Sequence, residues 1–300
     1  MAGSEPHLSA SPATFLDAFT VDVEEHFQVS AFEGSVRREE WDSHPSRVEA
    51  NTGRLLDFLD EAQVKGTFFV LGWIAERRPR LVRAIAERGH EVACHGYSHR
   101  LIYTQTPDQF REETVRAKRV IEDAGGSPVE GYRAASFSVT ARSLWATDVL
   151  AEAGFVYDSS LYPVLHDRYG IPGAPRHPYT LKTPSGARLV EIPPSTFRVG
   201  GAVLPVAGGG YLRLYPLRLT RWAIRRIHEQ DASPAVIYVH PWETDPDQPR
   251  VDAPLMTRFR HYVGLRTTLT KLRMLARAFR FAPMRKIVEA ASPLSEVSLS

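Results

Sequence analysis

The sequence predicts an α/β fold in which helices cover a mostly parallel sheet. From Phe15 onward, short apolar stretches typical of buried strands alternate with longer stretches of helical periodicity. The polar residues suited to chemistry also follow the carboxyl ends of the predicted strands. A barrel collects such residues at one mouth, so we expect a closed (β/α) barrel rather than an open doubly wound sheet, which the alternation alone would also allow.

The individual elements follow from local patterns. Residues 19–23 alternate apolar and polar, which predicts a strand that turns Asp22 and Glu24 to the same face. The run T-P-D-Q at 106–109 is a strong helix start, with a Thr cap, Pro at the first position and Gln three residues after the cap. Further strands are expected at 67–71, 91–94, 129–134, 155–157, 188–192 and 235–239, and helices at 52–63, 79–88, 107–124, 141–153 and 216–229.

The composition excludes several functional classes. The formal net charge of the 300 residues is only +2, so no nucleic acid is expected as a partner. Cys94 is the single cysteine, which excludes an intrachain disulfide and fits a reducing compartment. The first residues lack the basic and apolar regions of a signal peptide, and no apolar run approaches the roughly 18 residues of a membrane span. We therefore expect a cytoplasmic protein, and the oligomeric state is left open.

Four segments are expected along the chain. They are a flexible arm at 1–14, the barrel at 15–250, a basic helical extension packed on the barrel at 251–288, and a tail at 289–300. Two long stretches rich in Pro and Gly, at about 159–187 and 193–215, are expected to be loops that wall a substrate groove.

The extension has an unusual charge distribution. From Ala253 to Val288 there are nine Lys or Arg residues and no Asp or Glu. Apolar residues recur at helical spacing over 265–279, so a helix packed by its apolar stripe, with a solvated basic face, explains the segment. The alternative is a surface for anionic lipid at the inner membrane, or for an anionic glycan intermediate.

The motif C-H-G-Y-S-H is a candidate metal site. It places His95 and His99 four residues apart, so their imidazoles could share one side of a helical turn and chelate one metal ion. Such pairs also occur by chance, and Gly96 stands where a zincin protease has Glu. The acidic strand end with Asp22 and Glu24 is the natural donor of a third ligand. These carboxylates would act as a base and a ligand, although a solvated strand end would explain Asp22 equally well.

Residues after later strands complete the candidate site. His240 follows the apolar strand V-I-Y-V, where an imidazole suits a general acid. Arg133 is expected to orient Asp22, although a surface Arg is equally compatible with the sequence. Asp158 could orient or tune His240, or simply begin a turn.

Other residues near these motifs have weaker signals. Trp242 and Tyr162 could stack on sugar faces, although most aromatic residues in such a chain belong to the core. Cys94 is expected to be a small buried hydrophobe beside the site. A Ser nucleophile is disfavoured because the sequence has no G-x-S-x-G elbow.

Taken together, these motifs resemble the polysaccharide deacetylase family. The resemblance rests on D-V-E, H-G-Y-S-H, G-Y-R-A-A-S-F-S and V-H-P-W-E, and it extends from about residue 15 to residue 284. It is closest to a subgroup linked to exopolysaccharide loci and the exosortase system, through T-V-D-V-E-E-H-F-Q-V-S-A-F, H-P-W-E-T-D-P-D-Q-P-R and R-F-R-H-Y-V-G-L-R. It implies a single distorted (β/α) barrel and metal-dependent removal of N-acetyl groups from amino sugars of a polysaccharide or its precursor.

The resemblance also implies a role for each motif residue. It assigns Asp22 as the catalytic base, Arg133 as the partner of that base, and His240 as the general acid. It assigns His95 and His99 as ligands of one divalent metal ion, with zinc as the expected species.

The chain departs from the family at its first motif. Most members have two adjacent aspartates, the second of which binds metal, whereas Val23 intervenes here and Glu24 is the expected third ligand. Some relatives with Asp-x-Asp or Asp-x-Glu act on cyclic imides, and certain of those need no metal. Ala135 stands where Pro is usual, a change that the backbone should tolerate.

Two other functions are compatible with these residues. The first is a cyclic amidohydrolase on the same scaffold, acting on an imide or ureide with or without a metal, although long loops suit an extended glycan better than a small ring. The second is a non-catalytic partner of a polysaccharide synthesis complex, which the complete set of base, ligands and acid disfavours. A lipid-linked or nucleotide-linked precursor at the inner leaflet would reconcile a cytoplasmic location with an N-acetylated glycan substrate.

Overall fold

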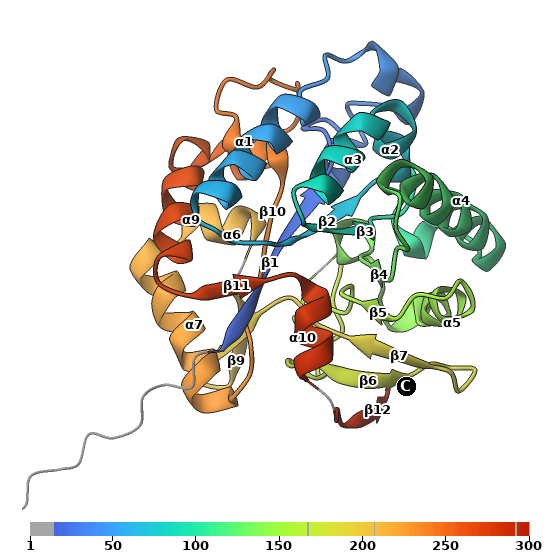
Figure 1. Ribbon diagram of the computed structural model, residues 1–300, viewed down its shortest axis with the longest axis vertical. Coiled ribbons are helices and arrows are strands. Elements are labelled where there is room, and N and C mark those ends of the chain that lie inside the picture. The colour runs from blue at the N-terminus through green and yellow to red at the C-terminus, as the bar shows by residue number, and fades with distance from the viewer. Residues whose placement is uncertain (1–14, 167, 207, 292, 300) are drawn as a thin grey trace, which may run out of the picture.

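The computed structural model describes residues 15–166, 168–206, 208–291 and 293–299. The predicted arm at 1–14 lies outside these residues. The described chain is a mixed α/β structure with one large sheet and a separate two-stranded hairpin (Figure 1). The predicted α/β fold with a mainly parallel sheet is therefore confirmed.

The large sheet has the strand order β10-β1-β2-β3-β4-β5-β7-β6-β12, and β11 also pairs with β1. Its strands are β1 (Leu16–Val23), β2 (Thr67–Val70), β3 (Glu91–Cys94), β4 (Gly131–Tyr132), β5 (Tyr157–Asp158), β6 (Tyr179–Lys182), β7 (Arg188–Glu191), β10 (Val236–Val239), β11 (Arg280–Ala282) and β12 (Glu296–Ser298). All of its pairs are parallel except the hairpin of β6 with β7.

The expectation of a closed barrel is corrected in one respect. Among the described strands, no pairing joins β10 to β12, so hydrogen bonds do not close the sheet. The reason lies between β7 and β10, where the chain forms the separate hairpin of β8 (Thr196–Val199) with β9 (Ala202–Pro205) instead of a strand that would bridge the gap. The sheet is thus an incomplete barrel.

Helices pack beside the strands of this sheet. In Figure 1, α2, α3 and α4 lie beside β2 to β4, whereas α6, α7 and α9 lie beside β1 and β10. The helices are α1 (Val48–Glu61), α2 (Gly72–Arg77), α3 (Pro79–Glu87), α4 (Pro107–Gly125), α5 (Trp145–Glu152), α6 (Gly209–Leu214), α7 (Leu217–Asp231), α8 (Leu255–Tyr262), α9 (Thr268–Ala276) and α10 (Met284–Ala290). The predicted start of α4 is confirmed, since Thr106 and Gln109 form a reciprocal capping box.

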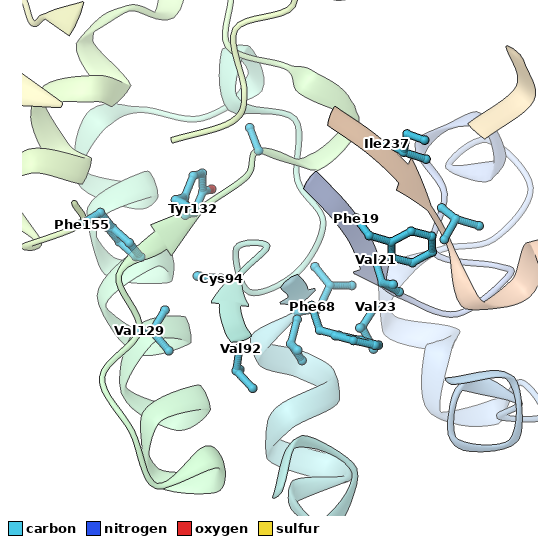
Figure 2. Packing of buried hydrophobic residues seen from close by; sticks show 14 of the residues in the cluster. Phe19, Val21, Val23, Phe68, Val92, Cys94, Val129, Tyr132, Phe155 and Ile237 are labelled. Carbon is cyan, nitrogen blue, oxygen red and sulfur yellow. The ribbon is translucent and has the colours of Figure 1, made fainter. Parts of the chain in front are cut away.

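The alternation along β1 separates the core from the interior polar face. Phe19, Val21 and Val23 pack with Phe68 in the main apolar cluster (Figure 2). Successive side chains of a strand point to opposite faces, so Asp22 is turned away from that cluster. The same alternation on β3 buries Val92 and Cys94 in the cluster and turns the next residue, His95, to the other side.

The stretch expected as a loop at 193–215 is more ordered than predicted, because it contains β8, β9 and α6. Gly208 forms a bridge with Tyr238 of β10, and a Cβ there would lie 2.1 Å from the Tyr238 ring. Only glycine allows this close approach. The glycine run of 208–210 thus brings α6 against the end of β10.

The basic C-terminal region packs on the sheet. Leu272 and Leu275 of α9 are buried, which confirms the apolar stripe of the predicted helix, although the α-helix itself is shorter than 265–279. Strand β11 lies beside β1, while the domain division at residue 250 stays a prediction. No helix within the described ranges is both long and apolar enough to traverse a bilayer.

Candidate active site

The carboxyl end of β1 supplies the first part of the site. Asp22 is 2% exposed, and its Oδ1 accepts a hydrogen bond of 2.8 Å from Nη1 of Arg133. The same Nη1 donates to Oγ1 of Thr20 at 2.7 Å, and Nη2 donates to Oγ of Ser159 at 3.0 Å. The guanidinium lies 4.1 Å over the ring of Phe69. Arg133 is therefore fully buried and held on several sides, with one carboxylate oxygen of Asp22 fixed to it.

Glu24, His95 and His99 come together next to this pair. One potential ligand atom from each lies within 4.8 Å of the others, and all three side chains are buried. Nε2 of His99 is 2.8 Å from Oε2 of Glu24. Nδ1 of His95 lies 2.8 Å from the carbonyl oxygen of Arg133, so this ring nitrogen is used by the backbone and Nε2 is left for a ligand.

The two histidines do not share a helical turn, contrary to the expectation from their spacing. The segment after β3 is a turn with positive φ at Gly96 (76°) and at His99 (52°). The backbone amides of Gly72 and Trp73, in the first turn of α2, donate to the carbonyls of Gly96 and Tyr97. The turn is thus bound to α2, which holds His99 in a left-handed conformation uncommon outside glycine.

His240 approaches the same centre from the end of β10. Its Nε2 lies 3.7 Å from Oε1 of Glu24 and 3.9 Å from Oδ2 of Asp22. Its Nδ1 contacts Oε1 of Glu243 at 2.7 Å. Burial alone would lower the pKa of His240, but the carboxylates of Glu24, Glu243 and Asp22 raise it to about 9. This imidazole is therefore protonated at neutral pH, with Nε2 directed toward the site.

The sequence prediction missed the residues that hold His240. Glu243 is fully buried, and its second oxygen accepts a 2.6 Å bond from Nε of Arg213. Nη1 of Arg213 donates to the carbonyls of His261 and Val263. The motif H-P-W-E could have indicated the contact between His240 and Glu243. Residues three apart in a 3₁₀ turn lie on one side, and the turn Pro241–Thr244 follows His240 directly.

Tyr162 does not reach the cavity that opens over the site, which corrects the prediction for it, whereas Trp242 lines this cavity but has other rings stacked on it. The Trp242 ring is stacked between His240, at a centroid distance of 5.0 Å, and His261, at 4.1 Å. Its Nε1 instead donates a 3.0 Å bond to Oε1 of Glu24. Tyr162 is 0% exposed and packs among Phe137 and other buried rings. Trp242 thus orients a candidate ligand, and Tyr162 belongs to the core.

Asp158 lies apart from His240. Its Oδ1 accepts a bond from Oγ of Ser160, and it is paired in register with Glu191 on the neighbouring strand β7. Burial raises the pKa of Asp158 to about 6 and raises the pKa of Glu191 well above its usual range. The expected role beside His240 is therefore filled by Glu243, while Asp158 forms a buried carboxyl pair with Glu191.

Two neighbours of the motifs have structural roles. The carboxylate of Glu25 accepts bonds from the backbone amides of Arg47 and Val48, so it caps the start of α1. Burial raises the pKa of the Cys94 thiol to about 12, which fits the expected inert, buried side chain.

A cavity of about 550 Å³ opens over the polar cluster. Asp22, Glu24 and the three histidines line it from the strand ends. Residues 29–31, Ser136, Phe137, Tyr238 and Trp242 also line it, and the rest of the wall comes from the two stretches that the sequence predicted as groove walls and from α8. These wall residues are His166, Arg168, Tyr169, Gly209, Gly210, Tyr211, Arg213, Leu214, Thr257, Arg260 and His261. The volume falls in the range typical of small-molecule and oligomer-end sites.

The donor set fits a divalent transition metal. Burial lowers the pKa of His95 to about 4, which keeps its ring neutral and able to bind a metal. Burial alone would raise the pKa of Glu24, yet His99 and His240 lower it to about 2, so its carboxylate is anionic. Nδ1 of His99 is buried without a hydrogen-bond partner in the described chain, and Oε2 of Glu24 has Nε2 of His99 as its neighbour at 2.8 Å. Two imidazoles and one carboxylate match the ligands of catalytic zinc sites.

Comparison with known families agrees with this geometry over part of the chain. Residues 40–157 match the family model described as polysaccharide deacetylase. The resemblance to this family is therefore confirmed over residues 40–157. Residues 159–289 match a second model, described as a domain of unknown function (DUF3473).

Curated relatives are similar to about a third of the chain. The chain is 32% identical over 98 residues to a peptidoglycan-N-acetylglucosamine deacetylase of Bacillus cereus, and 32% identical over 100 residues to a chitooligosaccharide deacetylase of Bradyrhizobium. These matches cover 32% and 33% of this chain. They span only 36% and 43% of the relatives' own length.

Solved structures share the fold over a larger part of the chain. A Mycobacterium smegmatis protein whose name refers to polysaccharide deacetylase is similar over 100% of this chain and 98% of its own, with TM-score 0.65 and 24% identity. The allantoinase Puue is similar over 93% of this chain and 92% of its own, with TM-score 0.59 and 16% identity. At these identities the likeness concerns the fold.

The site is assembled from three parts of the chain. Asp22 and Glu24 precede the deacetylase match, His95, His99 and Arg133 lie inside it, and the His240 motif lies inside the second match. The segment that matches the deacetylase model thus contains both histidine ligand candidates, and the other candidate residues apart from Arg133 lie in the sequence that flanks it.

Proposed function

We propose that this protein hydrolyses the N-acetyl group of an amino sugar in a polysaccharide or its precursor. The observation that carries the proposal is the convergence of Glu24, His95 and His99 beside the Asp22–Arg133 pair and His240. The three ligand candidates would hold one divalent ion, proposed to be zinc, which supplies Lewis acidity to the acetamide carbonyl and lowers the pKa of a nucleophilic water.

Asp22 is the proposed general base. Its Oδ1 is fixed by Arg133, which leaves Oδ2 to accept the proton of the attacking water. Because Arg133 is buried and itself held by Thr20 and Ser159, the carboxylate is oriented before substrate arrives.

His240 is the proposed general acid. The contact of Nδ1 with Glu243 leaves Nε2 as the nitrogen that faces the site, and the raised pKa of His240 supplies its proton at neutral pH. The C–N bond of the acetamide breaks as this proton passes to the sugar nitrogen. The products are acetate and a free amine, which balances the addition of one water.

Finer parts of the proposal rest on the sequence. They are the place in exopolysaccharide synthesis within the exosortase-linked subgroup, a cytoplasmic location, and contact of the basic C-terminal region with the inner membrane. The long segments that contribute to the cavity wall, together with α8, suit an extended glycan better than a small ring such as a ureide.

Acetate release tests the proposed activity directly. The zinc-loaded chain would be incubated with N-acetylglucosamine oligomers, with peptidoglycan fragments, and with allantoin and hydantoin as ring substrates. We expect acetate from at least one N-acetylated glycan, none from Asp22→Asn, and no ring opening. Ring opening without acetate release would instead support the cyclic amidohydrolase.

A further inference from the structure

Helix α8 carries an exposed apolar face. Leu255 is 82% exposed, Met256 60% and Phe259 55%, and these are three of the four most exposed large apolar side chains in the described part of the chain. Single exposed apolar residues are common on protein surfaces. Three on one eight-residue helix form a patch, and such patches mark interaction sites.

The arrangement around α8 is that of an interfacial helix. At about 100° per residue, Leu255, Met256 and Phe259 fall within an arc of roughly 100°, and Arg258 and Arg260 lie on either side of it. Long Arg side chains beside an apolar face can keep their charges at the headgroups while their stems cover apolar surface.

The opposite side of α8 holds the helix to the site. His261 is buried and stacks on Trp242, and its Nε2 contacts Oε1 of Gln248 at 2.9 Å. Thr257 and Arg260 line the cavity. The exposed face and the cavity mouth therefore belong to the same short helix, on its outer and inner sides.

The charge around this face suits an anionic surface. The stretch from Ala253 to Val288 has nine basic and no acidic residues. Within the described ranges, neither Arg258 nor Arg260 makes an ion pair, whereas Arg273 of α9 is bound to Glu61 at 3.3 Å. Unpaired arginines beside exposed apolar side chains place the attractive charge on α8 more than on α9.

We propose that the outer face of α8, formed by Leu255, Met256, Arg258 and Phe259, docks on an anionic lipid bilayer, with Arg260 at the boundary between this face and the cavity. Docking in this orientation places α8, whose inner side lines the cavity, against the bilayer in which the lipid anchor of a lipid-linked N-acetylated glycan would lie. The docking itself is independent of the proposed activity; only the benefit for a lipid-linked substrate rests on that activity.

Vesicle co-sedimentation of the full chain tests this proposal without any catalytic assay. We expect binding to vesicles of phosphatidylcholine and phosphatidylglycerol in equal amounts, and little binding to phosphatidylcholine alone. The triple variant Leu255→Ser, Met256→Ser, Phe259→Ser should bind the anionic vesicles about a hundredfold more weakly, since it loses three inserting side chains. Arg258→Glu should weaken binding to the anionic vesicles and leave the weak binding to phosphatidylcholine vesicles unchanged.

Matched variants control for general surface changes. Val115 and Val156 are also about half exposed but lie on other elements, so their double Ser variant should bind like the wild type. Circular dichroism would verify that each variant is folded. The triple variant should release acetate from a soluble glycan at the wild-type rate, because its three residues do not line the cavity.

Three results would overturn the proposal. The first is a wild-type chain that sediments no more with anionic vesicles than without them. The second is loss of binding in Arg273→Glu, Arg277→Glu, Arg280→Glu while the α8 triple variant binds normally, which would move the surface to α9. The third is a wild-type dimer that the α8 triple variant dissociates, without vesicle binding by either, which would assign the face to a second copy of the chain.

Discussion

The segment that matches the deacetylase family, residues 40–157, and the segment that follows it, residues 159–289, each fix one carboxylate of β1. The first segment supplies Arg133, which binds Asp22 at 2.8 Å. The second supplies Trp242, which donates to Glu24 at 3.0 Å. The base candidate and the carboxylate ligand candidate lie two residues apart at the carboxyl end of β1, yet separate parts of the chain orient them.

The two segments also differ in how they are built. The first consists of parallel strands and helices, and its His95 and His99 are tied to the sheet and to α2 by backbone bonds. The second contains a hairpin, short helices and long connections, and it forms most of the cavity wall. The two histidine ligand candidates thus lie on a regular scaffold, and the segment that forms most of the cavity wall is irregular.

The largest expected effect is on the base held by the first segment. Asp22→Asn should lower acetate release by about a thousandfold, because a positioned general base contributes on that order. Metal content should stay at the wild-type level, since Asp22 is not among the ligand candidates. Steady-state acetate assays with elemental analysis of the same sample measure both quantities.

Glu25→Gln is the matched control for that variant. Glu25 is a neighbouring buried carboxylate, but it caps α1 and does not line the cavity. Its loss should lower the melting temperature and leave kcat within a few-fold of the wild type. Retention of more than a tenth of the activity in Asp22→Asn would remove Asp22 from the role of base.

The role of the second segment is tested at Glu243, the residue that positions His240. Glu243→Gln should lower kcat by about thirtyfold to a hundredfold with little change in KM, because the charge that fixes Nδ1–H is lost. Glu243→Asp should recover part of that activity. Equal loss in the Gln and Asp variants, together with a matching loss of folded protein, would indicate a purely structural role.

The buried partner of Glu243 requires a second variant. Glu243→Gln leaves Arg213 buried without its ion pair, which can cost about 3 kcal/mol of stability. Adding Arg213→Met to Glu243→Gln should restore stability in urea unfolding and leave kcat low. Recovery of kcat in the double variant would contradict the positioning role.

The link from the second segment to the metal ligand has a smaller expected effect. Trp242→Phe removes the N–H donor to Glu24 and should weaken zinc binding by about tenfold, as loss of a bond to a ligand commonly does. Competition with a chromophoric chelator gives the dissociation constant. Trp145→Phe, a change in α5 away from the site, is the control and should leave zinc affinity unchanged. Unchanged zinc affinity in Trp242→Phe would show that the bond from Trp242 to Glu24 does not contribute to zinc binding.

The smallest expected effect concerns the buried carboxyl pair of Asp158 and Glu191. Burial raises the pKa of Asp158 from 3.8 to about 6, so its contribution to stability is present below about pH 4 and is lost as the pH rises through 6. Asp158→Asn should therefore remove part of the fall in unfolding free energy between pH 4 and pH 6. Urea unfolding at both pH values measures this, with the exposed Asp123→Asn as control. If the unfolding free energy of Asp158→Asn depended on pH as that of the wild type does, Asp158 would not contribute to this fall in stability.

The sequence was informative where local patterns decide the structure. The alternation of β1 and the cap at Thr106 were predicted correctly, because periodicity and capping are local. The partner of His240 was misplaced onto Asp158, since pairing between distant strands is not visible in local patterns, whereas Glu243 lies three residues away in a turn. Trp242 could not be distinguished from a sugar platform without knowing that His240 and His261 cover both of its faces.

Metal content per chain tests the central claim most directly. Elemental mass spectrometry would compare the wild type, His99→Ala and Asp22→Asn, each purified without chelator and then offered zinc. The account predicts about one transition metal ion per chain in the wild type and in Asp22→Asn, and a large loss in His99→Ala. A wild-type chain that holds no metal even after zinc is offered would contradict the site of Glu24, His95 and His99 and would favour a metal-independent hydrolase.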